Sequence, residues 1–316
     1  MQISFKKYRK LVFMGFVLGL LVVFSLLFFA DFKAVSKVLH NINIAYLPII
    51  FILAPLNYAL RYAKWNYYLN CLDIHIDKKV SRNIFISGLA MTITPGKIGE
   101  LFKSYLLKEE SNIPIARSSP IIVAERATDG IAMIILASVG TLTYSYGFLV
   151  LILTLLVMTV GLSFLYFDKP YLIVKDLFFR FDFTRKYFTW LDRFKESSKK
   201  LFAPKSLFFA IGIGVISWGF EGLVVFFSLR ALGGEISILG SIFVVAFSSV
   251  VGAVSTLPGG LGVAEGSIVA ILMLLGVSKE MSAATTLVTR FSTLWLGVII
   301  GMIGLWNARK YMEIRG

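Results

Sequence analysis

The stretch Leu257-Pro258-Gly259-Gly260-Leu261-Gly262-Val263-Ala264-Glu265 interrupts a long apolar segment, Ile238–Gly276. A second apolar segment, Ile84–Leu107, is interrupted by Thr94-Pro95-Gly96-Lys97-Ile98-Gly99-Glu100. Proline and glycine end helices, and non-helical backbone at membrane depth persists only against protein or a water-filled cavity. Each segment is therefore predicted to form a broken hairpin that enters and leaves the membrane on the same side. The longer segment, Ile238–Gly276, also has enough residues for two full spans, which is the alternative.

The composition around these breaks is that of a membrane protein. Of the 316 residues, 57% are hydrophobic and 16% are charged, against about 45–50% and 25% in soluble domains. This excludes soluble, disordered, fibrous and disulfide-scaffold proteins. The chain has one cysteine, Cys71, and two distant histidines, His40 and His75. No intrachain disulfide, metal site or cofactor is therefore predicted.

Uncharged or nearly uncharged stretches of about 20 residues are long enough to cross a bilayer. The first follows a basic N-terminus and is too long for a signal-peptide core, so an uncleaved span is expected. The sequence therefore predicts an all-α polytopic membrane protein of about six full spans plus the two broken hairpins. The number of spans becomes eight if the hairpins cross the membrane. The six predicted spans are Leu11–Ala30, Ile44–Leu60, Ile121–Thr143, Gly147–Phe167, Leu207–Leu229 and Ala283–Trp306.

The basic residues indicate the orientation of the chain. Of 32 Lys and Arg, 26 fall in residues 1–10, 61–120, 168–206 and 307–316. These are the segments that face the cytoplasm if the N-terminus does, so the positive-inside rule predicts a multi-pass cell-membrane protein with both termini cytoplasmic. The net charge of +14 then favours contact with anionic lipid and predicts no nucleic-acid partner. Residues 168–206 are interpreted as an amphipathic connector on the inner leaflet.

The two breaks resemble each other, which indicates an internal repeat. From Glu100 to Arg126 is 26 residues, and from Glu265 to Arg290 is 25. Asn57 and Arg61 precede the first break at about the distance at which Trp218 and Glu221 precede the second. Within a single integral membrane domain, 1–316, we therefore predict a first repeat over 44–167 and a second over 207–306, inverted because an odd number of crossings separates them. Inverted repeats with broken helices are typical of secondary transporters. The alternative is chance recurrence of a Pro-Gly motif in a chain with 26 glycines.

Several charged residues lie in or at the ends of apolar stretches. Each would cost about 2.5–3.5 kcal/mol at a helix centre, so pairing is expected. Arg126 and Asp129 are placed to pair locally, and we predict that Glu100 or Glu265 pairs with Arg126 or Arg290 across the two repeats. An interfacial cluster at the cytoplasmic end of the span is the alternative for Glu125, Arg126 and Asp129.

The glycines suggest an anion site. A Pro-Gly-Gly turn that leads into a helix exposes backbone N–H groups at a positive dipole end, which suits a phosphate. The spacing is not that of a P-loop, so nucleotide hydrolysis gains no support. The candidate substrate-binding residues are Lys97, Glu100, Lys103, Glu125, Arg126, Asp129, Glu221, Gly259, Gly260, Gly262, Glu265 and Arg290.

Together these motifs resemble the lysylphosphatidylglycerol synthase transmembrane (flippase-like) family, from the second span to the last. The residues that carry the resemblance are Pro95–Glu100, Lys103, Leu106-Leu107, Glu125-Arg126-x-x-Asp129, Leu257–Glu265 and Arg290. The resemblance implies a stand-alone member without the soluble aminoacyl-transferase domain. Lys97 and Lys103 stand where many relatives have arginine; lysine keeps the charge but not the bidentate geometry.

Three functional hypotheses follow. The first is a flippase-like, non-enzymatic transporter that moves an anionic phospholipid, an aminoacyl-phospholipid or a polyprenyl-phosphate-linked sugar between leaflets. The second is an integral membrane enzyme acting on a lipid phosphate, with Glu100 or Glu265 as base. The third is a non-catalytic membrane subunit that serves a separate transferase partner in lipid or glycolipid modification.

Overall fold

The computed structural model describes residues 5–141, 148–179 and 185–315, and these contain helices but no strand. The α-helices are α1 (Phe5–Phe29), α2 (Phe32–His40), α3 (Leu47–Cys71), α4 (Lys78–Leu89), α5 (Phe102–Ser111), α6 (Ile115–Thr141), α7 (Phe148–Tyr166), α8 (Asp168–Phe179), α9 (Arg185–Leu201), α10 (Pro204–Ala231), α11 (Ile238–Val254), α12 (Val263–Leu274), α13 (Lys279–Arg290) and α14 (Leu296–Arg315). Short 3₁₀ segments are η1 (Ile44–Tyr46), η2 (Ala90–Ile93), η3 (Pro95–Leu101) and η5 (Pro258–Gly260), and η6 (Phe291–Trp295) is a π-helical turn.

An all-α polytopic membrane protein is confirmed. Among the described residues, four helical stretches are long and apolar enough to cross a membrane: Val12–Phe29, Ile44–Cys71, Pro204–Ala231 and Lys279–Trp306. The other two predicted spans are also helical. Helix α6 has 27 residues, about 40 Å at 1.5 Å per residue, but it carries several charges; α7 has 19 residues. Helix α3 runs to Cys71, well past the end predicted for that span at Leu60.

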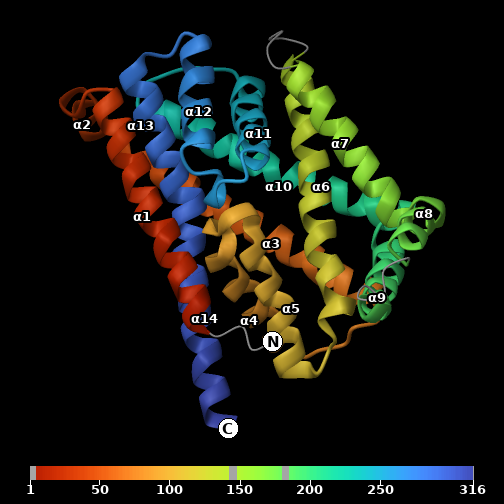
Figure 1. Cartoon of the computed structure of the whole chain (residues 1–316). Coiled ribbons are helices and arrows are strands. Elements are labelled where there is room, and N and C mark those ends of the chain that lie inside the picture. The colour runs from red at the N-terminus through yellow and green to blue at the C-terminus, as the bar shows by residue number, and fades with distance from the viewer. Residues whose placement is uncertain (1–4, 142–147, 180–184, 316) are drawn as a thin grey trace.

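The two interrupted segments form hairpins of short helices. Helices α4, α5 and α12 have 12, 10 and 12 residues, about 15–18 Å each, which is short of a hydrocarbon core of about 30 Å. Figure 1 shows the α4–α5 hairpin and the α11–α12 hairpin lying toward opposite ends of the molecule, with their breaks in between. Both η2 and η3 contact η5. This geometry favours hairpins over paired full spans.

The packing of the two halves is symmetric. Each half contains a long helix, a broken hairpin and a second long helix: α3, α4–α5 and α6, then α10, α11–α12 and α13–α14. The first long helices, α3 and α10, pack against each other, while α6 packs on α11 and α14 packs on α4. Each hairpin is thus held by the last helix of the other half. The inverted repeat stays a prediction, and it is favoured by this reciprocal packing of each hairpin against the last helix of the other half.

The predicted connector contains helices α8 and α9. Helix α9 packs on α6 and α7, and Lys195 donates hydrogen bonds to the carbonyl oxygens of Phe164, Leu165 and Phe167 at 3.1, 3.0 and 2.6 Å. These carbonyls lie at the end of α7, where a helix lacks intrahelical donors. Lys195 therefore ties the connector to the membrane helices.

Candidate functional site

The second break is a glycine turn closed by an ion pair. Gly259, Gly260 and Gly262 have φ of 60°, 68° and 86°, values that a side chain disfavours. Glu265 accepts a hydrogen bond from the Gly262 N–H at 2.7 Å through Oε2 and one from Arg290 Nε at 2.5 Å through Oε1. Arg290 Nη2 also donates to the Gly259 carbonyl at 3.1 Å. Arg290 and Glu265 therefore bind both sides of the turn.

The first break is held by a threonine. Thr94 Oγ1 accepts the Gly99 N–H at 2.9 Å. Next to it, Arg126 Nε lies 3.4 Å from Glu100 Oε2, and Arg126 Nη2 lies 3.1 Å from Asp129 Oδ2 on its own helix. Both carboxylates are buried. Arg126 is thus shared between two acids and, within the part of the chain that the structure describes, makes no hydrogen bond to the backbone of the break.

The predicted pairing across the repeats is wrong. Glu100 pairs with Arg126 and Glu265 pairs with Arg290, so each pair forms within its own half. The nearly equal spacing of 26 and 25 residues has a simple geometric cause. After each break the chain runs down a short helix, turns, and returns along an antiparallel helix to the level at which it started. The local pair of Arg126 with Asp129 is as predicted.

Asp129 is also bound by two basic residues of α3. Lys64 Nζ donates a short hydrogen bond to Asp129 Oδ1, and Arg61 Nη2 lies 4.0 Å from Oδ2. The Lys64 side chain is 1% exposed, and a buried charge of this kind is tolerated only when paired. Lys64 was not among the predicted site residues, because the residues after Leu60 were expected to form a cytoplasmic segment. Its place one turn after Arg61 on a continuing helix was the available signal.

A separate buried pair joins Lys103 to Glu125 at 2.5 Å. The Lys103 ammonium lies 4.6 Å from the centroid of the Trp65 ring, a cation–π distance. Neither Lys103 nor Glu125 lines the cavity described next. The side chain of Lys97 lies outside the described residues.

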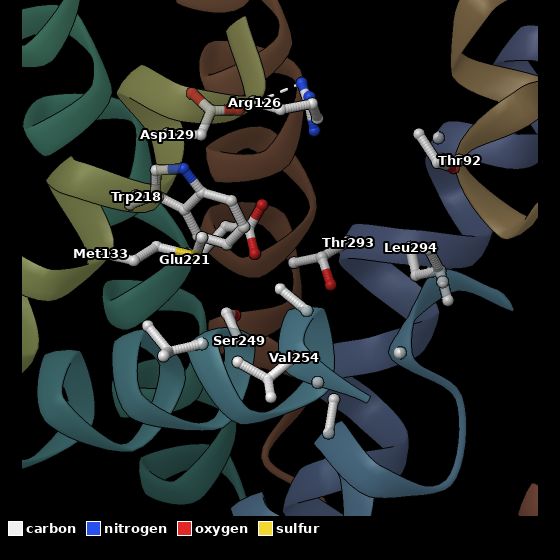
Figure 2. Close-up of a pocket in the computed structure, with 18 of the residues that line it drawn as sticks. Thr92, Arg126, Asp129, Met133, Trp218, Glu221, Ser249, Val254, Thr293 and Leu294 are labelled. Atoms are coloured by element: carbon white, nitrogen blue, oxygen red, sulfur yellow. Dashed lines mark ion pairs between the residues drawn. The ribbon is translucent and has the colours of Figure 1, made fainter. Parts of the chain in front are cut away.

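A cavity of about 370 Å³ lies where the two breaks meet. Three arginines and two carboxylates line it, together with apolar side chains and the turn of the second break. Figure 2 shows Arg126, Asp129 and Glu221 among the lining side chains. The charged lining residues are Arg61, Arg126, Arg290, Asp129 and Glu221. Of the other predicted site residues, Gly259 and Gly260 line the cavity. Glu100 and Glu265 do not line it but pair with the lining residues Arg126 and Arg290, and Gly262 donates to Glu265.

A chain of buried hydrogen bonds positions Glu221. Ser217 Oγ donates to Asn57 Oδ1 at 2.7 Å, and Asn57 Nδ2 donates to Glu221 Oε1 at 2.7 Å. Ser217 and Asn57 are each 1% exposed. This chain joins α3 to α10 and fixes the carboxylate at the cavity wall. The sequence marked Asn57 only as a position that corresponds between the two repeats. A neutral amide in an apolar stretch does not by itself indicate a buried ion site.

The π-helical turn η6 directly follows Arg290. A π turn leaves the regular hydrogen-bond ladder and occurs frequently at functional sites. Here the Tyr58 hydroxyl donates a short hydrogen bond to the Thr293 carbonyl within that turn, and Tyr58, Thr293 and Gly297 line the cavity. No sequence motif predicts a π turn, so the contact between Tyr58 and this turn was not predicted.

Comparison with known proteins identifies the family. The family described as the lysylphosphatidylglycerol synthase TM region matches residues 16–301. The chain belongs to this family. It is also similar to archaeal proteins named UPF0104 membrane protein. One from Pyrococcus horikoshii, PH1989, is 25% identical and covers 94% of this chain and 97% of its own length. One from Methanothermobacter thermautotrophicus is 23% identical over 92% and 93%.

Proposed function

We propose that this protein moves a lipid with an anionic headgroup between leaflets, and that the central cavity binds the phosphate. The candidate lipids are an anionic phospholipid, an aminoacyl-phospholipid and a polyprenyl-phosphate-linked sugar. The observation that carries the proposal is the set of three arginines, Arg61, Arg126 and Arg290, around one cavity inside a helical bundle.

Arginines at such a place favour a phosphate ligand. A guanidinium presents planar donors that match phosphate oxygens, and such charge-assisted bonds are stronger than neutral ones. Arg126 is the best placed of the three. Its side chain is 23% exposed, more than those of Arg61 (13%) and Arg290 (17%). It also makes no hydrogen bond to the backbone that the structure describes, so a phosphate can approach it without opening either break.

The arrangement of the breaks favours transport over simple binding. Hairpins from opposite ends of the bundle meet at one cavity, which allows access from either side when one half moves against the other. We further propose a cell-membrane location with both termini in the cytoplasm, because 26 of the 32 basic residues lie in segments that would then share that face.

The test is leaflet exchange in liposomes. Purified protein is reconstituted with phosphatidylethanol or phosphatidylcholine labelled on an acyl chain, and loss of fluorescence is followed after a membrane-impermeant quencher is added. We expect protein-dependent exchange of the anionic lipid. A charge-assisted hydrogen bond contributes about 1.5–3 kcal/mol, so Arg126→Gln is expected to slow exchange at least about tenfold.

Arg82→Gln is the matched control, because Arg82 is exposed on α4 and does not line the cavity. It is expected to leave the rate unchanged. Exchange no faster than in empty vesicles, or an equal effect of the two substitutions, would contradict the proposal.

A further inference from the structure

One wall of the cavity carries a hydrogen-bond donor that has no partner within the described structure. Trp218 lines the cavity and is 8% exposed, and its indole Nε1 is buried without a hydrogen bond to any described residue. Buried polar groups are nearly always hydrogen-bonded, and each exception needs an explanation. A ligand in the cavity supplies one.

Trp218 has an acidic neighbour on the same helix face. Glu221 follows it by three residues on α10, which places both side chains on one side of the helix. The Ser217–Asn57–Glu221 hydrogen bonds hold the carboxylate in place. Figure 2 shows Trp218 and Glu221 at the cavity, with Arg126 and Asp129 on the neighbouring helix α6. The wall therefore offers a donor, the Trp218 N–H, and a positioned acceptor, the Glu221 carboxylate, and both line the cavity.

This pair of groups selects among headgroup chemistries. An ammonium group has donors only and cannot accept from the Trp218 N–H. It would also add positive charge to a cavity lined by three arginines and two carboxylates. A hydroxyl group can accept from Trp218 and donate to Glu221 at the same time. The cavity, at about 370 Å³, lies within the range of small-molecule sites and has room for more than a phosphate.

We infer that the Trp218–Glu221 wall is a second subsite, which binds the hydroxyl groups of a polyol or sugar attached to the phosphate. The arginines bind the phosphate, and the Trp218–Glu221 wall binds the group that is attached to the phosphate. This inference rests on the proposed function, since it names the headgroup class of the same site.

The test compares three phosphodiester lipids with identical acyl chains, bound to the full-length protein in nanodiscs. Phosphatidylinositol offers hydroxyls, phosphatidylethanol has the same charge without them, and phosphatidylethanolamine offers an ammonium. We expect phosphatidylinositol to bind at least about tenfold more tightly than phosphatidylethanol. In Trp218→Phe, which keeps the aromatic ring and removes the N–H, this ratio is expected to fall to about two or less.

Trp190→Phe is the matched control, because Trp190 is exposed on α9, and it should keep the full ratio. Glu221→Gln, which keeps the size of the side chain, should also lower the ratio. Equal binding of phosphatidylinositol and phosphatidylethanol, an unchanged ratio in Trp218→Phe, or tightest binding of phosphatidylethanolamine would overturn the subsite. If phosphatidylethanol still binds in an Arg126-dependent way, only the subsite fails; if no anionic lipid binds, the proposed function fails with it.

Discussion

The two breaks use the same residue types in different ways. At the second break, Arg290 is hydrogen-bonded to both Glu265 and the Gly259 carbonyl, and Glu265 also binds the Gly262 N–H. At the first break, Thr94 binds the backbone, and Arg126 only approaches two carboxylates as an ion pair. Arg290 is hydrogen-bonded into a turn, while Arg126 lines the cavity with its charge balanced by two carboxylates and without a hydrogen bond to the described backbone.

The difference indicates a division of roles. A buried arginine that bonds to backbone stabilises a conformation, whereas one shared loosely between acids can exchange a partner for a ligand. We therefore expect Arg290 to matter most for stability and Arg126 to matter most for binding. Substitutions at the two breaks should separate these two roles.

Removing Arg290 should destabilise the protein most. Arg290→Ala leaves Glu265 buried without its cation, and breaking such a pair costs about 3–5 kcal/mol. Arg126→Ala also removes a cation from buried Glu100. It should nevertheless cost less, because Asp129 keeps Lys64 and because Arg290, unlike Arg126, also loses a hydrogen bond to the described backbone of its break. Unfolding free energies measured in detergent would show the order, and equal losses for the two variants would remove the distinction between the breaks.

The glycine turn of the second break should resist substitution. Gly260 has a φ of 68°, and a Cβ atom there would come within 3.3–3.4 Å of the Gly252 backbone. Gly260→Ala is expected to lose at least about 1–2 kcal/mol. Gly266→Ala is the control: Gly266 lies in α12 with open space around it, so alanine should be neutral or stabilising by up to about 1 kcal/mol. Thermal unfolding of both variants checks this, and a tolerated Gly260→Ala would contradict the turn geometry.

The Tyr58 hydroxyl should stabilise the π turn beside Arg290. Tyr58→Phe removes its hydrogen bond to the Thr293 carbonyl and is expected to cost about 1 kcal/mol. Tyr62→Phe, on the same helix, removes a longer and exposed bond of 3.3 Å to the Lys78 carbonyl and should cost less. The comparison is by chemical denaturation, and the reverse order would show that the π turn does not depend on Tyr58.

The connector, remote from both breaks, should show the smallest effect, and one that depends on pH. A hydrogen bond from Lys175 lowers the pKa of the Asp192 carboxyl, and one from Tyr171 adds to this. Because the folded pKa is lowered, the contribution to stability is present above the ordinary Asp pKa of about 4 and is lost as the pH falls toward the lowered value. The Asp192 side chain is half-exposed and the Lys175 side chain is partly exposed. A contribution of less than about 1 kcal/mol to the free energy of unfolding is therefore expected.

Asp192→Asn should therefore lower the unfolding midpoint slightly at pH 7 and not at the acid end of the stable range. A deficit of the same size at both pH values would show that the carboxylate charge is not the cause.

The sequence predicted the fold well because its signals were local. Apolar length, Pro-Gly breaks and the shared Glu-to-Arg spacing each depend on a short stretch of chain, and they predicted an all-α membrane protein with two hairpins. The spacing also drew attention to Glu100, Arg126, Glu265 and Arg290, which form the ion pairs at the two breaks. It did not tell which acid meets which arginine, because that depends on how each hairpin folds back on its own half.

Other parts of the site depend on tertiary contacts that no local pattern carries. Lys64 was assigned to a loop because the charges of Arg61 and Lys64 end the apolar run, yet Asp129 compensates both and the helix continues. The partner of Asn57 lies 164 residues away in sequence. Conversely, Lys103 and Glu125 bear the right charges but neutralise each other away from the cavity.

The central claim is that the cavity between the breaks attracts anions and binds an anionic headgroup. Its most direct test is a cysteine at Ser249, a cavity-lining residue, in a Cys71→Ser background. The rate of its modification is measured with thiol reagents of equal size and opposite charge, with and without phosphatidylethanol. Faster reaction with the anionic reagent and protection by the lipid are the predicted result. Faster reaction with the cationic reagent, or no protection, would contradict the account.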